Sequence, residues 1–261
     1  MKRVLIVISA VAAVICSCKS QYELLLEGND VDAKYAAAFD YFNQGKYAKS
    51  AALFESLSLA AAGTERGDTV QYYLGLSNYN FQDFSTAEAN FDKFLSSYPL
   101  SPFAEQASFF RVDCLYRSTL RYELDQSPTY KALAALSEYL VSYPESVNAD
   151  MCRFMIQELG ERLDKKTFEN ARIYYVMEDY QASRVAFKNI LKDDADNIYR
   201  EDILYYSAMS SYKYAYNSIP AKQKERYLIF VDDYFTFVDE FPESQHRAEL
   251  DKLYEKVKEK N

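Results

Sequence analysis

The stretch "FDYFNQGKYAKSAALFESL", residues 39–57, places an aromatic residue, a small residue and a second aromatic residue at a helical spacing. These are Tyr47, Ser50 and Phe54. Positions separated by three and four residues lie on one face of a helix, so these three side chains share a face. Another apolar helical stretch precedes Tyr47. The segment therefore predicts a helix, a tight turn and a second helix.

The same pattern recurs along the chain. "SNYNFQDFSTAEANFDKFL" (77–95) repeats it 37 residues later, and "YYVMEDYQASRVAFKNIL" (174–191) carries a further copy. The second helices are followed by proline, in "SYP" at 97–99 and 142–144 and in "EFP" at 240–242. Because proline ends a helix, these positions mark where one repeat stops. The sequence predicts an array of helix-turn-helix units.

The array resembles the tetratricopeptide repeat. Its signature of small, aromatic and closing proline positions is clearest in the second unit, at Gly75, Phe84, Ala87, Phe91 and Pro99. The small positions are needed where two helices cross closely. We expect an all-α tetratricopeptide-repeat solenoid over 30–242, without independent domains, followed by a polar helical tail over 243–261. About five units fit, at roughly 30–62, 66–100, 102–144, 146–195 and 197–242.

The N-terminus indicates export. Lys2 and Arg3 precede an apolar run over 4–15 that is too short to span a bilayer and is typical of a signal peptide. The run ends in "ICSC", which resembles the bacterial lipobox with Cys18 as the modified cysteine. The resemblance implies a signal peptide over 1–17, removed together with Cys16, and a lipidated tether over 18–29, with fatty acids such as palmitate on Cys18. Plain cleavage, which would leave Cys18 as a free thiol, is the alternative.

The expected location follows from the same segment. Lys19 follows Cys18 and no run of aspartates does. By resemblance to known sorting signals, this favours the outer membrane, with the protein anchored by its lipid and facing the periplasm. Apart from that lipid, no cofactor and no metal is expected. Cys114 and Cys152 are expected to be buried thiols, and a disulfide between them is the less favoured alternative.

The net charge and the absence of catalytic motifs limit the classes of function that the chain can have. The chain has 30 basic and 39 acidic residues, a formal charge of −9, which argues against nucleic acid as a partner. No metal-binding, phosphate-binding or nucleophile motif is present. His246 is interpreted as a surface histidine, and the acidic pairs Asp193-Asp194 and Asp232-Asp233 as solvated charge, since adjacent helical carboxylates diverge. The chain is therefore not expected to be an enzyme.

A binding function is therefore expected, and the first helix of each unit is expected to form the binding surface. Aromatic and amide side chains recur there and could hold an extended peptide that carries aromatic residues. The alternative is that many of these rings pack between helices. The candidate groove consists of Tyr35, Phe39, Phe42, Asn43, Tyr72, Leu76, Tyr79 and Asn80.

Longer stretches resemble one family more specifically. "YELDQSPTYKALAALSEYLVSYPES", "LDKKTFENARIYYVMEDYQASRVAFKNILKD" and "YREDILYYSAMSSYKYAYNSIPAKQKERY", together with the lipobox, look like the BamD family, in its Bacteroidetes-like form. These are lipoproteins of the outer-membrane β-barrel assembly machinery. The resemblance implies a non-enzymatic scaffold whose N-terminal units receive the C-terminal strand of unfolded outer-membrane proteins. Its C-terminal units would hold a POTRA domain of the barrel-forming subunit.

The family resemblance also implies a role for one arginine. Arg200, in "NIYREDIL", stands where the family has an arginine that contacts the barrel subunit, and its planar guanidinium can grip a carboxylate at two points. The alternative is a surface charge pair with Glu201 or Asp196. A rival hypothesis keeps the fold and makes the protein a repeat lipoprotein scaffold that coordinates cell-wall synthesis with envelope constriction.

Overall fold

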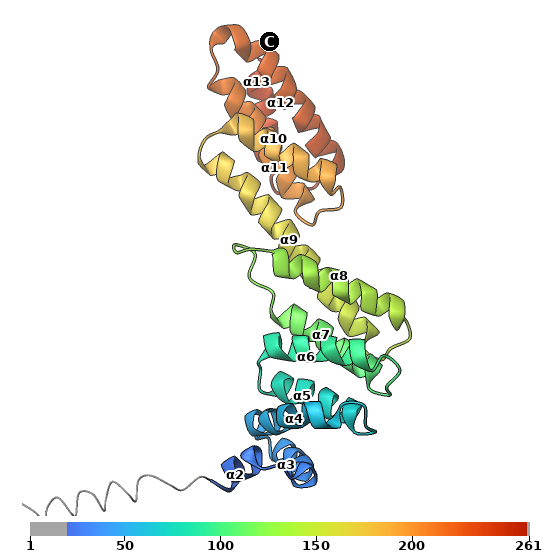
Figure 1. Cartoon of the computed structure of the whole chain (residues 1–261). Helices are drawn as coiled ribbons and strands as arrows, with labels where there is room; N and C mark the ends of the chain where they lie inside the picture. The colour runs from blue at the N-terminus through green and yellow to red at the C-terminus, as the bar shows by residue number, and fades with distance from the viewer. Residues whose placement is uncertain (1–19, 260–261) are drawn as a thin grey trace, which may run out of the picture. The chain divides into compact units, whose positions relative to one another are not determined.

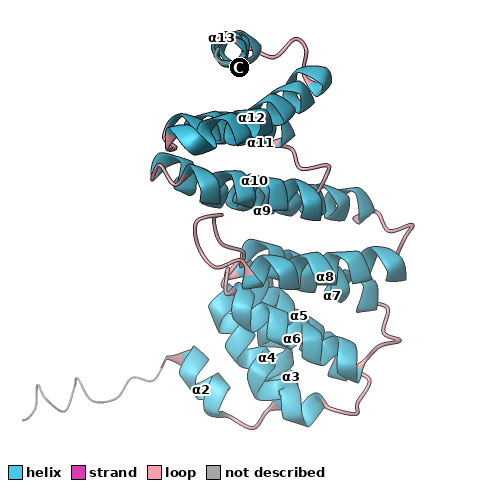
Figure 2. Cartoon of the chain, turned by 90° about the horizontal axis from the view of Figure 1, so that it is seen from above, coloured by secondary structure: helices cyan, strands magenta, loops and turns pink. Residues whose placement is uncertain are grey.

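The computed structural model describes residues 20–259, which form twelve α-helices (Figure 1). Their bounds are α2 Gln21–Glu27, α3 Val31–Asn43, α4 Tyr47–Ala61, α5 Gly67–Asn80, α6 Phe84–Ser97, α7 Ala104–Arg117, α8 Ser127–Ser142, α9 Ala149–Val176, α10 Tyr180–Asp193, α11 Arg200–Tyr216, α12 Pro220–Glu240 and α13 Arg247–Lys258. The pairs from α3–α4 to α11–α12 occupy the five expected repeat ranges (Figure 2). The predicted all-α tetratricopeptide-repeat fold is confirmed. The signal peptide and Cys18 lie outside the described residues.

The turn inside a repeat has the same backbone geometry in three units. A residue with positive φ, in the left-handed region, ends the turn: Gly45 at 71°, Gln82 at 66° and Glu178 at 62°. In the second and fourth units an aspartate follows and caps the next helix, since Asp83 accepts from the Thr86 N–H and Asp179 from the Ala182 N–H. The chain thus reverses within a few residues, and the aromatic residue of the repeat begins the second helix.

Close helix crossings explain the small residues of the repeat. A Cβ added to Gly75 on α5 would lie 2.8 Å from Cε1 of Phe91 on α6. Ser50 and Ser183, at the small position of their second helices, are buried and contact a serine 27 residues later. The Oγ atoms lie 3.0 Å apart in the Ser50–Ser77 pair and 2.9 Å apart in the Ser183–Ser210 pair. The expectation that size at these positions limits the crossing is confirmed.

The described chain divides by contact into two compact units, which the repeat pattern does not predict. The first contains residues 20–119 and 127–153, and the second contains 120–126 and 154–259. The loop over 120–126 belongs to the second unit because α9 holds its backbone. Arg162 donates to Leu120 O at 3.0 Å, and Lys166 donates to Tyr122 O at 3.0 Å and to Leu124 O at 2.9 Å.

Two of the apolar clusters in the first unit involve its first five helices after α2. One gathers residues of α3, α4 and α5 around Leu53, Phe54 and Leu74. The other joins α5, α6 and α7 around Phe91 and Phe94, both fully buried. The thiols of Cys114 and Cys152 are free and buried, as predicted, and burial raises their pKa values to about 12 and about 11.

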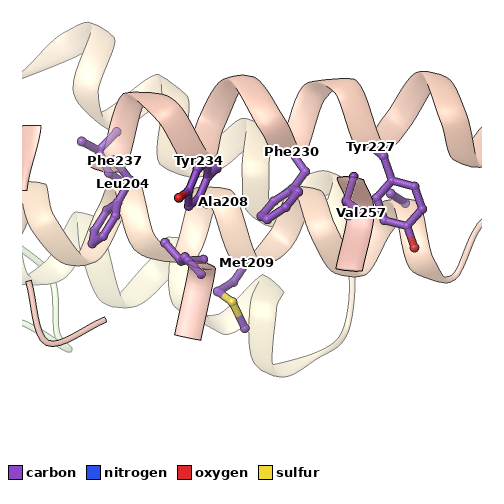
Figure 3. Packing of buried hydrophobic residues seen from close by; sticks show 10 residues of the cluster. Leu204, Ala208, Met209, Tyr227, Phe230, Tyr234, Phe237 and Val257 are labelled. Carbon is purple, nitrogen blue, oxygen red and sulfur yellow. The ribbon is translucent and has the colours of Figure 1, made fainter. Parts of the chain in front are cut away.

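The main core of the second unit includes the predicted tail. Phe230, Tyr234 and Phe237 of α12 point into this core (Figure 3), and α13 adds Leu250 and Val257. The tail is helical as expected, and its buried face covers the last repeat as a terminal cap does. His246, expected on the surface, is partly exposed: its ring stacks on that of Tyr205, with ring centroids 4.1 Å apart, and a quarter of its side chain remains exposed.

One acidic pair departs from its expected role. Asp193, Asp194 and Asp232 are exposed, but Asp233 is 6% exposed. Its carboxylate accepts from Ser211 Oγ and lies 2.9 Å from both Arg184 Nε and Lys188 Nζ. The prediction of solvated charge is wrong for Asp233. Its spacing from Phe230 and Phe237 places it on the inward face of α12, where a carboxylate must be paired.

Candidate peptide-binding surface

The eight candidate groove residues occupy matching positions on α3 and α5, 37 residues apart. The equivalent pairs are Tyr35 with Tyr72, Phe39 with Leu76, Phe42 with Tyr79, and Asn43 with Asn80. Equivalence in the repeat does not give equal exposure, since α5 lies between two helix pairs whereas only the short α2 precedes α3. Tyr72 is buried, Asn43 is exposed, and the other six residues are half-buried.

The rings of α3 gather around Tyr73, a tyrosine outside the eight candidate groove residues. The ring of Tyr73 lies 4.7 Å from that of Phe39 and 5.2 Å from that of Phe42, in both cases edge to face. Phe39 also contacts Phe54 of the core at 5.1 Å. These contacts fix the rings while each keeps part of its surface exposed. The signal for Tyr73 was available, because Phe110 stands at the equivalent position of the next unit.

Tyr72 is a core residue and not part of an open groove. It is 3% exposed, its ring stacks on Phe103 at 4.5 Å, and its hydroxyl donates to Gln106 Oε1 at 2.7 Å. Its assignment to the client-binding groove is therefore wrong. The ring covering it comes from the residue before α7, and Phe103 lies 31 residues after Tyr72. Stacking of the next repeat thus closes this position.

Arg66 occupies the equivalent position over Tyr35. Its guanidinium carbon lies 4.6 Å from the Tyr35 ring centroid, and its Nη1 lies 2.7 Å from Asp32 Oδ1. The hydrogen bond to Asp32 raises the pKa of Arg66. Beside this pair is a hollow of about 370 Å³ between α3, the end of α4 and the start of α5, with an apolar wall that includes Val31, Leu57 and Val70. An apolar hollow next to a cation suits a ring and a carboxylate together.

Tyr79 is hydrogen-bonded to the buried carboxylate of Asp113. Its hydroxyl donates to Asp113 Oδ2 at 2.5 Å, and Arg117 Nε donates to the same oxygen at 2.6 Å. Burial is the main cause that raises the pKa of Tyr79 to about 12, and the hydrogen bond to Asp113 adds to it. The hydroxyl is therefore occupied, and only the face and edge of the ring are available to a ligand.

The remaining candidate groove residues differ in how much of each side chain is available to a ligand. Asn80 Nδ2 donates to Leu76 O at 2.8 Å, so part of its hydrogen-bonding capacity is used within α5. Asn43, the last residue of α3, is exposed, and Leu76 packs partly against the second core cluster. The usable surface thus consists of the Tyr35–Arg66 hollow, the rings around Tyr73 and the amide of Asn43. Arg66 and Tyr73 belong to this surface in addition to the candidate residues.

Arg200 begins α11 in the second unit and is already engaged. Its Nε and Nη2 both donate to the carboxylate of Glu240, at the end of α12, and its Nη1 donates to Ala195 O at 2.8 Å. Both side chains are about one-third exposed. The charge pair weighed as an alternative therefore exists, with Glu240 in place of Glu201 or Asp196. A carboxylate of a partner protein would have to share Arg200 with Glu240 or displace Glu240 from it.

Comparison with known proteins places the chain in a family. A family model described as an outer membrane lipoprotein, YfiO, matches residues 28–228. The chain belongs to this family. The match extends over both compact units and covers all repeats except the end of the last one. The assignment agrees with the family resemblance that the longer sequence stretches carry.

Two relatives accompany the YfiO match. The chain is 24% identical over 185 residues to the outer membrane protein assembly factor BamD of Caulobacter vibrioides, which is 70% of this chain. It spans 61% of the length of that curated relative. A crystal structure of a TPR repeats protein from Bacteroides fragilis is 15% identical with a TM-score of 0.41, covering 90% of this chain and all of that chain.

Among residues 20–259, no helix is both long and apolar enough to cross a membrane. Within the same residues, no group of three or more His, Cys, Asp and Glu side chains is placed to hold a metal ion.

Proposed function

We propose that this chain is a non-enzymatic periplasmic scaffold of the outer-membrane β-barrel assembly machinery. The observation that carries the proposal is the match of residues 28–228 to a family of outer membrane lipoproteins, with an assembly factor among the relatives. A lipid on Cys18 would anchor the chain at the periplasmic face of the outer membrane. Repeat pairs with exposed ring edges then supply binding surfaces but no reactive group.

The N-terminal repeats are proposed to receive unfolded outer-membrane protein clients. The Tyr35–Arg66 hollow would take a C-terminal aromatic side chain, and Arg66 would pair with the terminal carboxylate. The ring edges around Tyr73 would hold the preceding residues of an extended strand. Because Asp32 already pairs with Arg66 in an exposed position, exchange of one carboxylate for another costs little.

A pair of peptides tests this client site. Two fluorescent peptides ending in phenylalanine, one with a free carboxylate and one amidated, would be titrated against the full chain in mild detergent. The free acid should bind more tightly by up to about 1 kcal/mol, because only it can pair with Arg66 and the pair is exposed. Arg66→Ala should remove that difference while Arg121→Ala, an exposed arginine elsewhere, should keep it. Equal binding of both peptides to the unaltered chain would remove Arg66 from the site.

The C-terminal repeats are proposed to hold the POTRA domain of the barrel-forming subunit near Arg200. This arginine pins α11 to the end of α12 through Glu240, so it would present that corner of the repeat as well as contact the partner. Arg200→Lys keeps the charge but cannot reproduce a two-point contact. We expect it to weaken the partner complex while the isolated chain keeps its helical circular dichroism.

Crosslinking in cells decides between the scaffold hypotheses. The tagged chain would be crosslinked in its native envelope, solubilised in mild detergent and its stoichiometric partner identified by mass spectrometry. A barrel protein with tandem POTRA domains is the expected result. Peptidoglycan synthases or division proteins without a barrel subunit would favour the cell-wall scaffold. Cys18→Ala should release the chain from the membrane, and persistent attachment would contradict the lipid anchor.

A further inference from the structure

The first described helix begins directly after the expected lipid site. Only Lys19 separates Cys18 from Ser20, the residue that caps α2. Ser20 Oγ accepts from the Glu23 N–H at 3.2 Å, and the Glu23 carboxylate accepts from the Ser20 N–H at 2.6 Å. This reciprocal pair fixes the start of the helix. The reach from Cys18 to α2 is therefore limited by one intervening residue.

The short helix α2 is held by the first repeat. Tyr22, Leu25 and Leu26 pack against the apolar cluster of α3, α4 and α5, and the Tyr22 hydroxyl donates to Lys49 O at 3.2 Å. Two Cα–Cα steps span at most about 7.6 Å. The polar layer on each side of a bilayer is about 5–7 Å thick. A lipid on Cys18 would therefore hold the start of α2, and the first repeat with it, at the level of the headgroups.

Two lysines and two tyrosines form a surface cluster beside α2, here called the Tyr22–Lys49 cluster. Its members are Tyr22, Tyr41, Lys46 and Lys49. Lys49 Nζ lies 4.9 Å from the ring centroid of Tyr22 and 5.4 Å from that of Tyr41. Lys46 Nζ lies 5.6 Å from the ring centroid of Tyr41, and the two rings meet edge to face at 5.4 Å. Both lysines are exposed, whereas the rings are half-buried.

The positive charges of this cluster are available to an external anion. Among the described residues, no carboxylate forms an ion pair with Lys46 or Lys49, and the Lys46 ammonium donates to the neutral amide of Gln44 at 2.7 Å. The two glutamates of α2 lie about 100° and 140° around the helix from Tyr22, on other faces. Because the whole chain has a formal charge of −9, a basic site beside the lipid position is a local departure from its overall charge.

Lysine and tyrosine are suited to the surface of a bilayer. The stem of a lysine lies along apolar surface while its ammonium reaches the headgroups, and tyrosine rings are enriched where membrane meets water. Each lysine close to an anionic membrane strengthens binding about fivefold. This attraction falls off within about 8–10 Å at moderate salt, so it acts only on lysines that the lipid holds close to the membrane.

We propose that the Tyr22–Lys49 cluster binds the headgroups of anionic phospholipids and fixes the first repeat against the membrane surface. The proposal rests on the lipid anchor of the proposed function and goes beyond it, because a lipid alone tethers the chain without orienting it. The contact requires neither a client nor the barrel subunit. It can therefore be measured in vesicles that contain this chain alone.

A single tryptophan reports the contact. The chain contains no tryptophan, so Tyr22→Trp introduces the only one. The lipidated chain would be inserted into phosphatidylcholine vesicles, with or without phosphatidylglycerol, that carry some lipid with a nitroxide on its headgroup. With phosphatidylglycerol present, we expect the nitroxide to quench at least about half of the emission. Lys46→Gln combined with Lys49→Gln should reduce this quenching at least about twofold.

Two controls separate the charge from the position of the probe. Lys252→Gln combined with Lys256→Gln removes the same charge from exposed lysines of α13 and should leave the quenching unchanged. Leu100→Trp places the probe at a 96% exposed leucine past the end of α6 and should be quenched much less. If Tyr22→Trp alters the helical circular dichroism, Tyr41→Trp places the probe at the other ring of the cluster.

Co-sedimentation of the same samples distinguishes this proposal from the lipid anchor. A chain that sediments with the vesicles but is not quenched, or is quenched equally without phosphatidylglycerol, is anchored without binding anionic headgroups, which overturns this proposal alone. A chain that does not sediment with the vesicles contradicts the anchor as well. Unquenched emission that shifts to the blue as the protein density in the vesicles rises would assign the cluster to a second copy of the chain and likewise overturn the proposal.

Discussion

At the scale of single residues, helix separation depends on positions that tolerate no added volume. Gly75→Ala would place a methyl group 2.8 Å from the buried ring of Phe91. Part of the clash is offset because alanine favours helix more than glycine does, so we expect a net loss of about 1–2 kcal/mol in the free energy of unfolding. Urea denaturation followed by circular dichroism measures it.

A second glycine provides the control for Gly75. Gly160 lies inside α9, and a Cβ added there meets no atom within 4 Å. Gly160→Ala should therefore raise the free energy of unfolding by up to about 1 kcal/mol through helix propensity alone. A loss at Gly160 equal to that at Gly75 would mean that helix crossing is not what limits Gly75.

Asp233 allows a residue-scale test of buried charge. Asp233→Ala removes the acceptor shared by Ser211, Arg184 and Lys188 and leaves both cations without this partner. We expect a loss of about 2–3 kcal/mol in unfolding free energy, since both cations can reach water and recover part of the cost. Asp232→Ala, at the exposed neighbour, should change it by less than about 0.5 kcal/mol. Similar losses at both positions would contradict the burial of Asp233.

At the scale of elements, the turn within a repeat contains one residue with positive φ, and this residue is not always glycine. Gln82 and Glu178 adopt positive φ, which costs a residue with a side chain about 1–2 kcal/mol. Because glycine also loses more entropy on folding, we expect Glu178→Gly to stabilise the chain by about 0.5–1 kcal/mol. Thermal and urea unfolding would measure the gain.

The first unit supplies the reverse experiment. Gly45 holds the equivalent position with φ at 71° and has no atom near its missing Cβ. Gly45→Ala should destabilise by about 1 kcal/mol through backbone strain alone. If Glu178→Gly were destabilising and Gly45→Ala neutral, the turns would not share the geometry described.

The helix pairs could be predicted from the sequence because the spacing of residues that defines a helix pair lies within each repeat. Aromatic and small residues at helical spacing placed the first, second and fourth pairs. The closing prolines placed the third and fifth, and Pro99, Pro144 and Pro242 each lie two residues past a helix end. Burial on the first helices could not be predicted in the same way. Tyr35 and Tyr72 occupy equivalent positions of the repeat. Arg66 lies over Tyr35, however, whereas Phe103 covers Tyr72. The difference comes from which residue precedes the next helix, a position that the repeat signature leaves open.

At the scale of the whole molecule, buried tyrosines link stability to alkaline pH. Burial raises the pKa values of Tyr79, Tyr175 and Tyr234 from 10.0 to about 12, and those of Tyr72 and Tyr205 are raised as well. A folded chain therefore keeps these protons at a pH where the unfolded chain has released them. Since the unfolded state binds fewer protons above about pH 10, the free energy of unfolding falls as pH rises.

This linkage predicts cooperative alkaline unfolding. Stability from these tyrosines should be complete below about pH 10 and lost as pH rises toward about 12, with tyrosinate absorbance and helical circular dichroism changing together. Tyr79→Phe removes one linked group, so it should lower stability at neutral pH by loss of the Asp113 bond and make the alkaline decline less steep. Urea midpoints measured from about pH 8 to 12 give both quantities. If tyrosinate absorbance rises completely near pH 10 while helicity persists, these hydroxyls reach water in the folded chain. The tyrosine rings would then pack less tightly between the helices than their burial indicates.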